Sequence, residues 1–243
     1  KEFLKNETYA LISVFLLEAI YFYNFTTPEF NVNICQIPFW SLTVYYSWQS
    51  FKNNKTHNWI LFGFFAALGV LSKYLFIYLL TGIIFFFIYY LIKKKKFNFK
   101  YFIPIIIFLL VLSPHLIWLA DNDYKTIIYG LKRTSLDEGT YLNNFIYPLK
   151  FIIKQIAVLL PFFILLSLTL KNFKFKTNVR DEKSIFLISV ALVPIFLMAT
   201  TSLIFAANIR TMWMTPFYLF IGLFFIYHFK SNINLNSLKK FMI

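Results

Sequence analysis

Residues 74–96 read YLFIYLLTGIIFFFIYYLIKKKK, an unbroken apolar run that ends in four consecutive lysines. A helix needs about 20 apolar residues to cross a bilayer, because in hydrocarbon every backbone amide must find its partner within the helix. A lysine run directly after such a segment is typical of the cytoplasmic end of a spanning helix. The stretch therefore predicts a transmembrane helix with Lys93 to Lys96 at the cytoplasmic surface.

The rest of the composition agrees with a lipid environment. The 243-residue chain is 59% hydrophobic and 14% charged, whereas soluble domains carry about 25% charged residues. Its mean hydropathy is +0.66. The net charge of +14 would suit a nucleic-acid-binding protein, but the cations lie in short clusters between apolar runs, so no nucleic-acid partner is expected. Cys35 is the only cysteine, which excludes an intrachain disulfide.

Apolar runs of similar length recur along the whole chain. They predict an all-α fold, a polytopic transmembrane helix bundle of about eight spans that forms one domain over residues 1–243. The longest connection, an outer loop at 120–147, is expected to carry function, since long ordered loops often do. The predicted spans are 9–25, 35–50, 58–72, 74–92, 101–119, 148–170, 184–205 and 212–229.

Basic residues are distributed unevenly between the two sides of this topology. If the N-terminus is cytoplasmic, the inner turns hold most of the 24 lysines and arginines, including Lys52, Lys93 to Lys96 and the group from Lys171 to Lys183. By the positive-inside rule, both termini of this multi-pass protein should face the cytoplasm. The opposite side collects half of the ten carboxylates, including Glu29 and Asp123.

Lys73 separates the third and fourth predicted spans. A lysine at mid-bilayer costs about 2.5–3.5 kcal/mol on insertion scales, so Lys73 is expected at a tight turn on the outer face. Two interpretations compete there. Lys73 is either a snorkelling side chain that marks the interface, or a cation that holds the phosphate of a lipid-borne substrate.

Similar alternatives apply to two other outer positions. His115 and Trp118 share a helix face where the fifth span ends, and His115 suits a hydrogen bond, proton transfer or a divalent cation shared with Asp121 or Asp123. This spacing is too loose to predict a metal site, and no cofactor is firmly indicated. Arg210 and Trp213 are either interfacial anchors or an anion site. The sequence contains no P-loop, H-E-x-x-H or G-x-S-x-G motif.

Four short motifs follow one another on the predicted outer side. Together they resemble the GT-C class of polytopic glycosyltransferases, specifically the bacterial, family-39-like relatives of protein O-mannosyltransferases and of the lipid A aminoarabinose transferase. The motifs are T-T-P-E at Thr26–Glu29 before Phe39 and Trp40; G-x-x-x-x-L-G-V-L-S-K-Y at Gly63–Tyr74; S-P-H-L-I-W at Ser113–Trp118 with D-N-D-Y and then Lys132 and Arg133; and R-x-x-W-x-x-P at Arg210–Pro216.

The resemblance implies transfer of a sugar from a polyprenyl-phosphate donor to a lipid, glycan or protein acceptor, on the periplasmic face of a bacterial inner membrane. In the family, an acidic residue in the first outer loop is the base and cations stabilise the departing phosphate. That loop would lie upstream of Lys1, so the chain is expected to lack its N-terminal part and to be inactive alone. Glu29 stands where the family has aspartate.

The resemblance also implies roles for particular residues. Glu29 and Asp123 are the candidate catalytic residues, as contacts to acceptor or sugar. The candidate substrate-binding residues are Lys73, Tyr74, His115, Arg133, Arg210 and Trp213.

Two other functions remain open at this point. A transporter or flippase of lipid-linked substrates would carry paired charges or helix breaks near the bilayer midplane, and only Glu18 is of that kind. A non-catalytic membrane subunit would leave its outer polar residues scattered. Convergence of Glu29, Lys73, His115, Asp123 and Arg210 on one pocket would favour the enzyme.

Overall fold

The computed structural model describes residues 2–134, 141–170 and 181–233. Within these ranges the chain is helical and has no strand beyond an isolated bridge between Leu170 and Ile233. The predicted all-α helix bundle is thereby confirmed.

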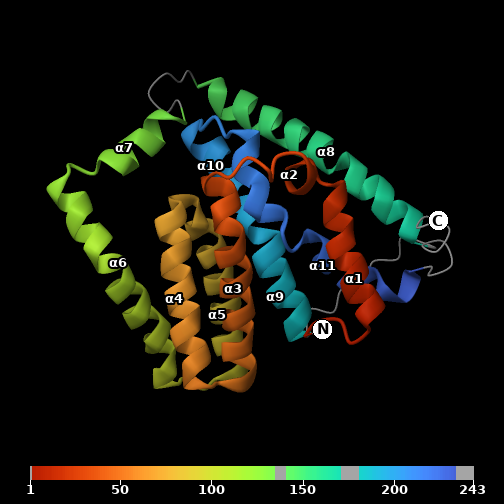
Figure 1. Ribbon diagram of the computed structural model, residues 1–243, viewed down its shortest axis with the longest axis horizontal. Helices are drawn as coiled ribbons and strands as arrows, with labels where there is room; N and C mark the ends of the chain where they lie inside the picture. Colours follow the sequence, from red (N-terminus) through yellow and green to blue (C-terminus); the bar gives the residue numbers. More distant parts are fainter. Residues whose placement is uncertain (1, 135–140, 171–180, 234–243) are drawn as a thin grey trace.

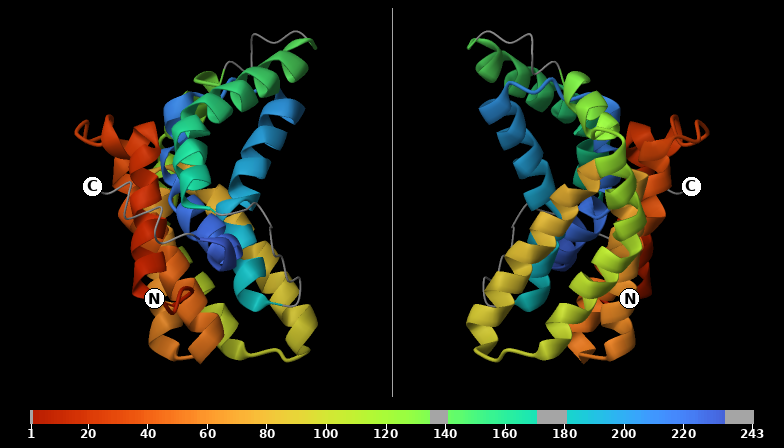
Figure 2. Two further views of the ribbon diagram at one scale, coloured as in Figure 1. Left: turned by 90° about the vertical axis from the view of Figure 1, so that its right-hand side faces the viewer. Right: turned by 90° about the vertical axis from the view of Figure 1, so that its left-hand side faces the viewer.

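Four helices follow one another in the first half of the chain; the first three lie side by side, and the fourth packs on the second and leans away from the others toward its end (Figure 1). They are α3 (Val32–Asn53), α4 (Thr56–Ser72), α5 (Ile77–Lys94) and α6 (Ile103–Asp121). We call the end at which α4 and α6 finish the Lys73 end, and the opposite end the Lys93 end. The turns from α3 to α4 and from α5 to α6 both lie at the Lys93 end (Figure 2). This alternation agrees with the turns that the lysine clusters predicted.

The turn residues explain why these helices stop where they do. Asn54 and Lys95 close α3 and α5 in the left-handed conformation, and each donates its backbone amide to a carbonyl of the last turn. Asparagine tolerates that conformation well. At the Lys73 end, Asn31 begins α3 and accepts a hydrogen bond from the amide of Asn33 through its side chain. This is the usual way to satisfy an amide of the first turn.

The second half of the chain covers one flank of these four helices (Figure 1). α7 (Lys125–Lys132) follows α6 and turns back across the Lys73 end, and α8 (Asn143–Thr169) is the longest helix. α9 (Glu182–Ala191) and α10 (Val193–Phe205) pack against α5. The 3-10 helix η5 (Thr211–Tyr218) packs on α3, and α11 (Ile221–Phe229) leads into η6 (Lys230–Asn232).

The number of spans is supported in part. Four helices of the described ranges are long and apolar enough to cross a membrane: Tyr74–Lys94, Phe99–Asp121, Asn143–Thr169 and Glu182–Phe205. A fifth span results if Thr211–Tyr218 and Ile221–Asn232, bent by 47°, are one broken span. α4 is apolar but shorter. α3 has spanning length, although buried polar residues such as Gln36 and Thr43 lower its hydropathy. The expectation of eight spans remains a prediction.

Two predicted boundaries differ from the structure. Residues 9–25 do not form one helix, because Ile20 is extended between α1 (Glu7–Phe15) with η1 (Leu16–Ala19) and the short α2 (Tyr21–Asn24). The predicted loop 120–147 contains α7 and the first turn of α8. Propensity explains the second difference: Asn143 to Tyr147 is too polar to read as hydrocarbon-spanning, yet nothing in it prevents a helix.

Aromatic side chains fill the interior where the two halves meet. Trp40 of α3 is fully buried and lies edge-on to Phe76 at 5.3 Å between ring centroids, and 5.0 Å from Phe217 of η5. Aromatic pairs at such distances add roughly 0.5–1.5 kcal/mol beyond area burial. The packing of η5 against α3 therefore fixes the last hairpin on the first half of the chain.

Two glycines of the quoted G-x-x-x-x-L-G motif allow close approach. A Cβ atom on Gly63 would lie 2.4 Å from the carbonyl oxygen of Pro104, so α4 and α6 touch through backbone. A Cβ atom on Gly69 would lie 2.3 Å from the ring of Phe76, which is fully buried. Gly69 thus sets how α4 packs immediately below Lys73, whereas Gly63 sets its contact with the start of α6, nearer the Lys93 end.

Candidate functional site

Lys73 lies in the tight turn that the sequence predicted. It ends α4 in an extended conformation, and the short helix η2 (Tyr74–Phe76) follows directly. Its ammonium group donates a hydrogen bond of 2.5 Å to the Oδ1 atom of Asn33 at the start of α3. The same group lies 5.0 Å from the centre of the Trp213 ring, a cation–π distance. Three segments that are distant in sequence therefore meet at one cation.

The surroundings of Lys73 disfavour its charge. Burial, and secondarily the positive charge of Arg133, lower the pKa of Lys73 from 10.5 to about 7. The lysine is thus placed where it lacks a carboxylate partner within the described residues. An anion bound at this position would supply the missing opposite charge and restore the protonated form.

A second group of polar side chains lies beside Lys73. The hydroxyl of Tyr74 is 2.7 Å from the Nε2 atom of His115 and 2.6 Å from the Oγ1 atom of Thr126. The imidazole ring also stacks on Trp118, with 5.8 Å between centroids. Tyr74 thereby connects the turn after α4, the end of α6 and the first turn of α7.

Arg133 ends α7 near this group. Its guanidinium donates a hydrogen bond of 3.0 Å to the hydroxyl of Tyr129 and is otherwise exposed. One residue later, the carbonyl of Thr134 accepts a hydrogen bond of 2.9 Å from the amide of Asn208, just before η5. This bond ties α7 to the hairpin that carries Trp213, so the segment bearing Arg133 is held over the Lys73 end.

Five of the eight residues proposed from the sequence lie in two contact pairs and one nearby cation at the Lys73 end, and only Lys73 and His115 belong to the set whose convergence on one pocket would favour the enzyme. Direct contacts join Lys73 to Trp213 and Tyr74 to His115, and Arg133 is near enough to lower the pKa of Lys73. The other three are exposed, and within the described ranges no side-chain hydrogen bond or ion pair joins them to this group. These three are Glu29, Asp123 and Arg210. Their proposed roles are untested by the geometry.

Sequence reasoning missed three polar residues of the site. Asn33 accepts the bond from Lys73, and Thr126 bonds to Tyr74. Gln36, one helical turn after Asn33, is fully buried, and neither its amide nitrogen nor its oxygen has a hydrogen-bond partner within the described part of the chain. An asparagine and a glutamine at the start of a membrane-spanning helix cost free energy in hydrocarbon. Their presence in α3 was the feature of the sequence that could have identified them as site residues.

The side chains of the site are suited to bind an anion that carries further polar groups. The Lys73 ammonium supplies charge, and the next residue, Tyr74, forms a separate hydrogen-bonded group with His115 and Thr126. Among the described residues, no three His, Cys, Asp or Glu side chains lie together as metal ligands. The site therefore suits a phosphate linked to a hydroxyl-rich group, held by side chains of the protein.

Part of the chain matches a known protein family. Residues 1–118 match the family described as dolichyl-phosphate-mannose-protein mannosyltransferase. The resemblance to GT-C glycosyltransferases is confirmed. This match supports membrane glycosyltransferase activity in general. The match includes Lys73, Tyr74 and His115 and ends at Trp118, whereas Arg133 and Trp213 lie beyond it. No curated protein and no solved structure matches the chain.

Proposed function

We propose that this protein transfers a sugar from a polyprenyl-phosphate donor to a lipid, glycan or protein acceptor at the outer face of a bacterial inner membrane. The observation that carries this proposal is the group of Lys73, Tyr74, His115, Arg133 and Trp213, which lies at the end opposite the lysine-rich turns. We call this group the Lys73 cluster. The family match adds glycosyltransferase activity in general.

The cluster suggests a division of roles. Lys73 contacts the phosphate of the donor, because it is a cation without an anionic partner in the described structure and lies where headgroups of the outer leaflet are expected. Tyr74 and His115 contact the sugar or the phosphate oxygens, and Trp213 provides an aromatic surface beside the cation. Arg133 adds positive charge. Stabilising the departing phosphate in this way lowers the barrier electrostatically.

Glu29 and Asp123 remain the proposed contacts to sugar or acceptor. Asp123 adopts a positive φ of 52° at the end of α6, directly before α7. The Asp123 carboxylate is exposed to solvent. A bound acceptor would bring its hydroxyl within hydrogen-bond reach of this carboxylate, and general-base catalysis requires that approach. A divalent cation shared by His115 with Asp121 or Asp123 remains the alternative for this part of the site.

The pH dependence of donor binding provides a first test. Only the protonated form of Lys73 attracts phosphate, and the pKa of about 7 places its loss within the physiological range. Affinity for polyprenyl phosphate, measured in detergent by native mass spectrometry, should fall about tenfold between pH 6 and pH 8. Lys73→Arg stays charged across this range. It should therefore remove the fall, and an equal fall in both proteins would contradict the assignment.

Sidedness provides a second test. In a Cys35→Ser background, Asp123→Cys should react with a membrane-impermeant maleimide in intact cells. Lys95→Cys should react only after permeabilisation, because the positive-inside rule places the Lys93 end in the cytoplasm. Labelling of both positions in the same compartment would refute the outer-face proposal.

A further inference from the structure

A second candidate binding site is an apolar cleft between α5 and α6. These consecutive helices pack on different partners, because α6 packs on α4 whereas α5 packs on α9 and α10. α6 also leans away from the other helices toward its end (Figure 1). The space that remains between α5 and α6 is a pocket of about 440 Å³, and its other walls are formed by α4 and the end of α3.

The cleft opens toward the membrane. The two helices that flank it belong to segments long and apolar enough to cross a bilayer, Tyr74–Lys94 and Phe99–Asp121. Three isoleucines of the lining, Ile77, Ile84 and Ile105, are each about half exposed. Half-exposed apolar side chains on spanning helices face hydrocarbon, so the interior of the cleft is continuous with the lipid of the bilayer.

The lining of the cleft indicates what fills it. Among the described residues, its polar side chains are Trp59, Thr81 and Tyr101. Trp59 donates its indole N–H to the Oδ1 atom of Asn54 at 3.1 Å, and Thr81 donates its hydroxyl to the carbonyl of Ile77 at 2.9 Å. Ordered water needs several polar partners, which these walls do not offer. An empty cleft would lose dispersion contacts along its walls. The occupant that fits is therefore a hydrocarbon chain.

Cations lie beside the cleft at the Lys93 end. Tyr101 lines the cleft from the short helix η3 (Phe99–Phe102), and Lys100 directly precedes it. Lys55 begins α4, and Lys100 donates a hydrogen bond of 3.0 Å to the backbone carbonyl of the neighbouring Asn54. In the part of the chain that the structure describes, neither lysine forms an ion pair with a carboxylate. Each such cation near a membrane surface attracts anionic headgroups by about 1 kcal/mol.

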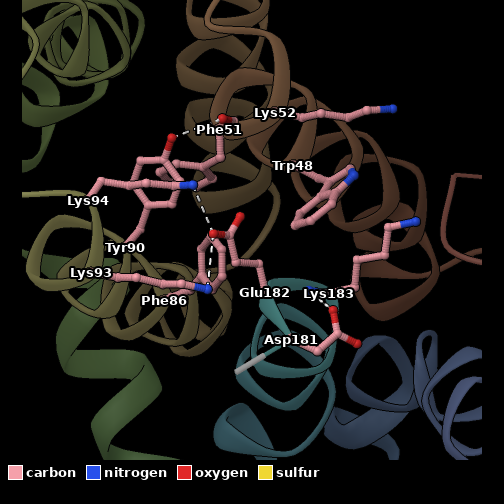
Figure 3. A pocket seen from close by; sticks show the side chains of 10 residues that line it. All are labelled: Trp48, Phe51, Lys52, Phe86, Tyr90, Lys93, Lys94, Asp181, Glu182 and Lys183. Atoms are coloured by element: carbon pink, nitrogen blue, oxygen red, sulfur yellow. Dashed lines mark hydrogen bonds and ion pairs between the residues drawn. The ribbon is translucent and has the colours of Figure 1, made fainter. Parts of the chain in front are cut away.

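The lysines at the end of α5 are engaged elsewhere. Lys93 and Lys94 face α9, where both approach the same Oε1 atom of Glu182 at 3.1 and 3.0 Å (Figure 3). Lys55 and Lys100 keep their charge available next to the cleft instead. The cleft thus combines apolar walls with positive charge at one end, as a phospholipid requires.

We propose that this cleft binds an anionic phospholipid, with one acyl chain between α5 and α6 and the headgroup near the turns that carry Lys55 and Lys100. The positive-inside rule makes the leaflet at the Lys93 end the inner one. Within a bilayer the hydrophobic effect does not favour the cleft over the surrounding lipid, so selection comes from packing against the walls and from headgroup charge. The site is separate from the Lys73 cluster and does not depend on sugar transfer.

The identity of the occupant is tested by titrating delipidated, detergent-purified protein and following binding by native mass spectrometry. Dioleoyl phosphatidylglycerol should bind about tenfold more tightly than dioleoyl phosphatidylcholine, which lacks net charge, and than dihexanoyl phosphatidylglycerol, which lacks a long chain. Equal binding of the phosphatidylcholine overturns the anionic headgroup, and equal binding of the short-chain lipid overturns the chain in the cleft. Displacement of bound phosphatidylglycerol by polyprenyl phosphate assigns the cleft to an isoprenoid chain and also overturns the proposal.

Two adjacent isoleucines of α6 provide a matched pair of variants. Ile105 lines the cleft and is 54% exposed, whereas Ile106 is 55% exposed and is not part of the lining. Ile105→Trp fills part of the cleft and should weaken binding of dioleoyl phosphatidylglycerol about tenfold. Ile106→Trp adds the same ring to the outer surface and should change binding less than about twofold. Equal losses in the two variants, which are equally exposed and so equally tolerated, refute the cleft.

A second pair of variants tests the headgroup. Lys55→Gln with Lys100→Gln should weaken binding of dioleoyl phosphatidylglycerol about tenfold and leave that of dioleoyl phosphatidylcholine unchanged. Lys125→Gln with Lys132→Gln removes the same charge at the opposite end of the molecule and should change binding less than about twofold. If both double variants lose affinity alike, general surface charge and not the cleft attracts the lipid.

Discussion

Replacing Lys73 by alanine is expected to reduce sugar transfer by about 10²–10³-fold, the usual cost of removing one group that stabilises charge in a transition state. The reason is positional. Lys73 is partly buried, bonded to neutral Asn33 and placed against the Trp213 ring, so no neighbouring carboxylate takes up its charge. Its charge is available to a ligand. The measurement is transfer from polyprenyl-phosphate-linked sugar in membranes that contain equal amounts of each variant, made in the full-length protein.

Membrane insertion should survive the same substitution. Removing a lysine from an interface makes a segment easier to insert, since the charged side chain costs free energy in hydrocarbon. Affinity for polyprenyl phosphate itself should fall along with transfer, which separates a binding role from a purely catalytic one. Lys125→Ala, at an exposed position of α7, is the matched control and should retain activity. Wild-type transfer by Lys73→Ala would remove Lys73 from the site.

A large effect on stability is expected from Gly63→Ala. The added methyl group would lie 2.4 Å from the carbonyl oxygen and 2.7 Å from the Cα atom of Pro104. Both are backbone atoms, so α6 must move away from α4 as a unit. Overpacking of this kind costs roughly 1–3 kcal/mol. The thermal midpoint of the detergent-purified protein should therefore fall by several degrees.

The control for this variant is Gly130→Ala in α7. A Cβ atom at Gly130 would meet no atom within 4 Å, so the same methyl group should be neutral there. Alanine is also the better helix former by about 1 kcal/mol, which favours a small gain. If Gly63→Ala and Gly130→Ala shift the midpoint equally, the close contact between α4 and α6 does not contribute to stability.

Much of the architecture follows from hydropathy and charge. The apolar run at Tyr74–Ile92 with its lysine stop predicted α5 to within a few residues, because a spanning helix depends on local composition alone. The extended turn at Lys73 followed from the cost of burying a cation. The broken first segment did not, since nothing in residues 9–25 distinguishes a straight helix from one interrupted at Ile20. That interruption is set by packing of η1 against α8 and α11.

The candidate site was predictable in its cationic and aromatic members and not in Asn33 and Thr126. Lys73, Arg133 and Trp213 stand out because cations and tryptophan at membrane boundaries are conspicuous in any hydropathy scan. Asn33 and Thr126 are ordinary helix-start residues until the fold places them against Lys73 and Tyr74. Their contribution depends on contacts between distant segments, which no local pattern encodes.

Trp213 belongs to the last hairpin, whereas the lysine beneath it is synthesised long before. During translation the Lys73 turn must therefore leave the ribosome and reach the membrane surface while its aromatic cover is still unmade. The site can be completed only when η5 docks against α3, late in biogenesis. A ribosome-bound nascent chain that stops after α10 would contain Lys73 but not Trp213. Ligand binding should therefore appear only once the final hairpin has been synthesised.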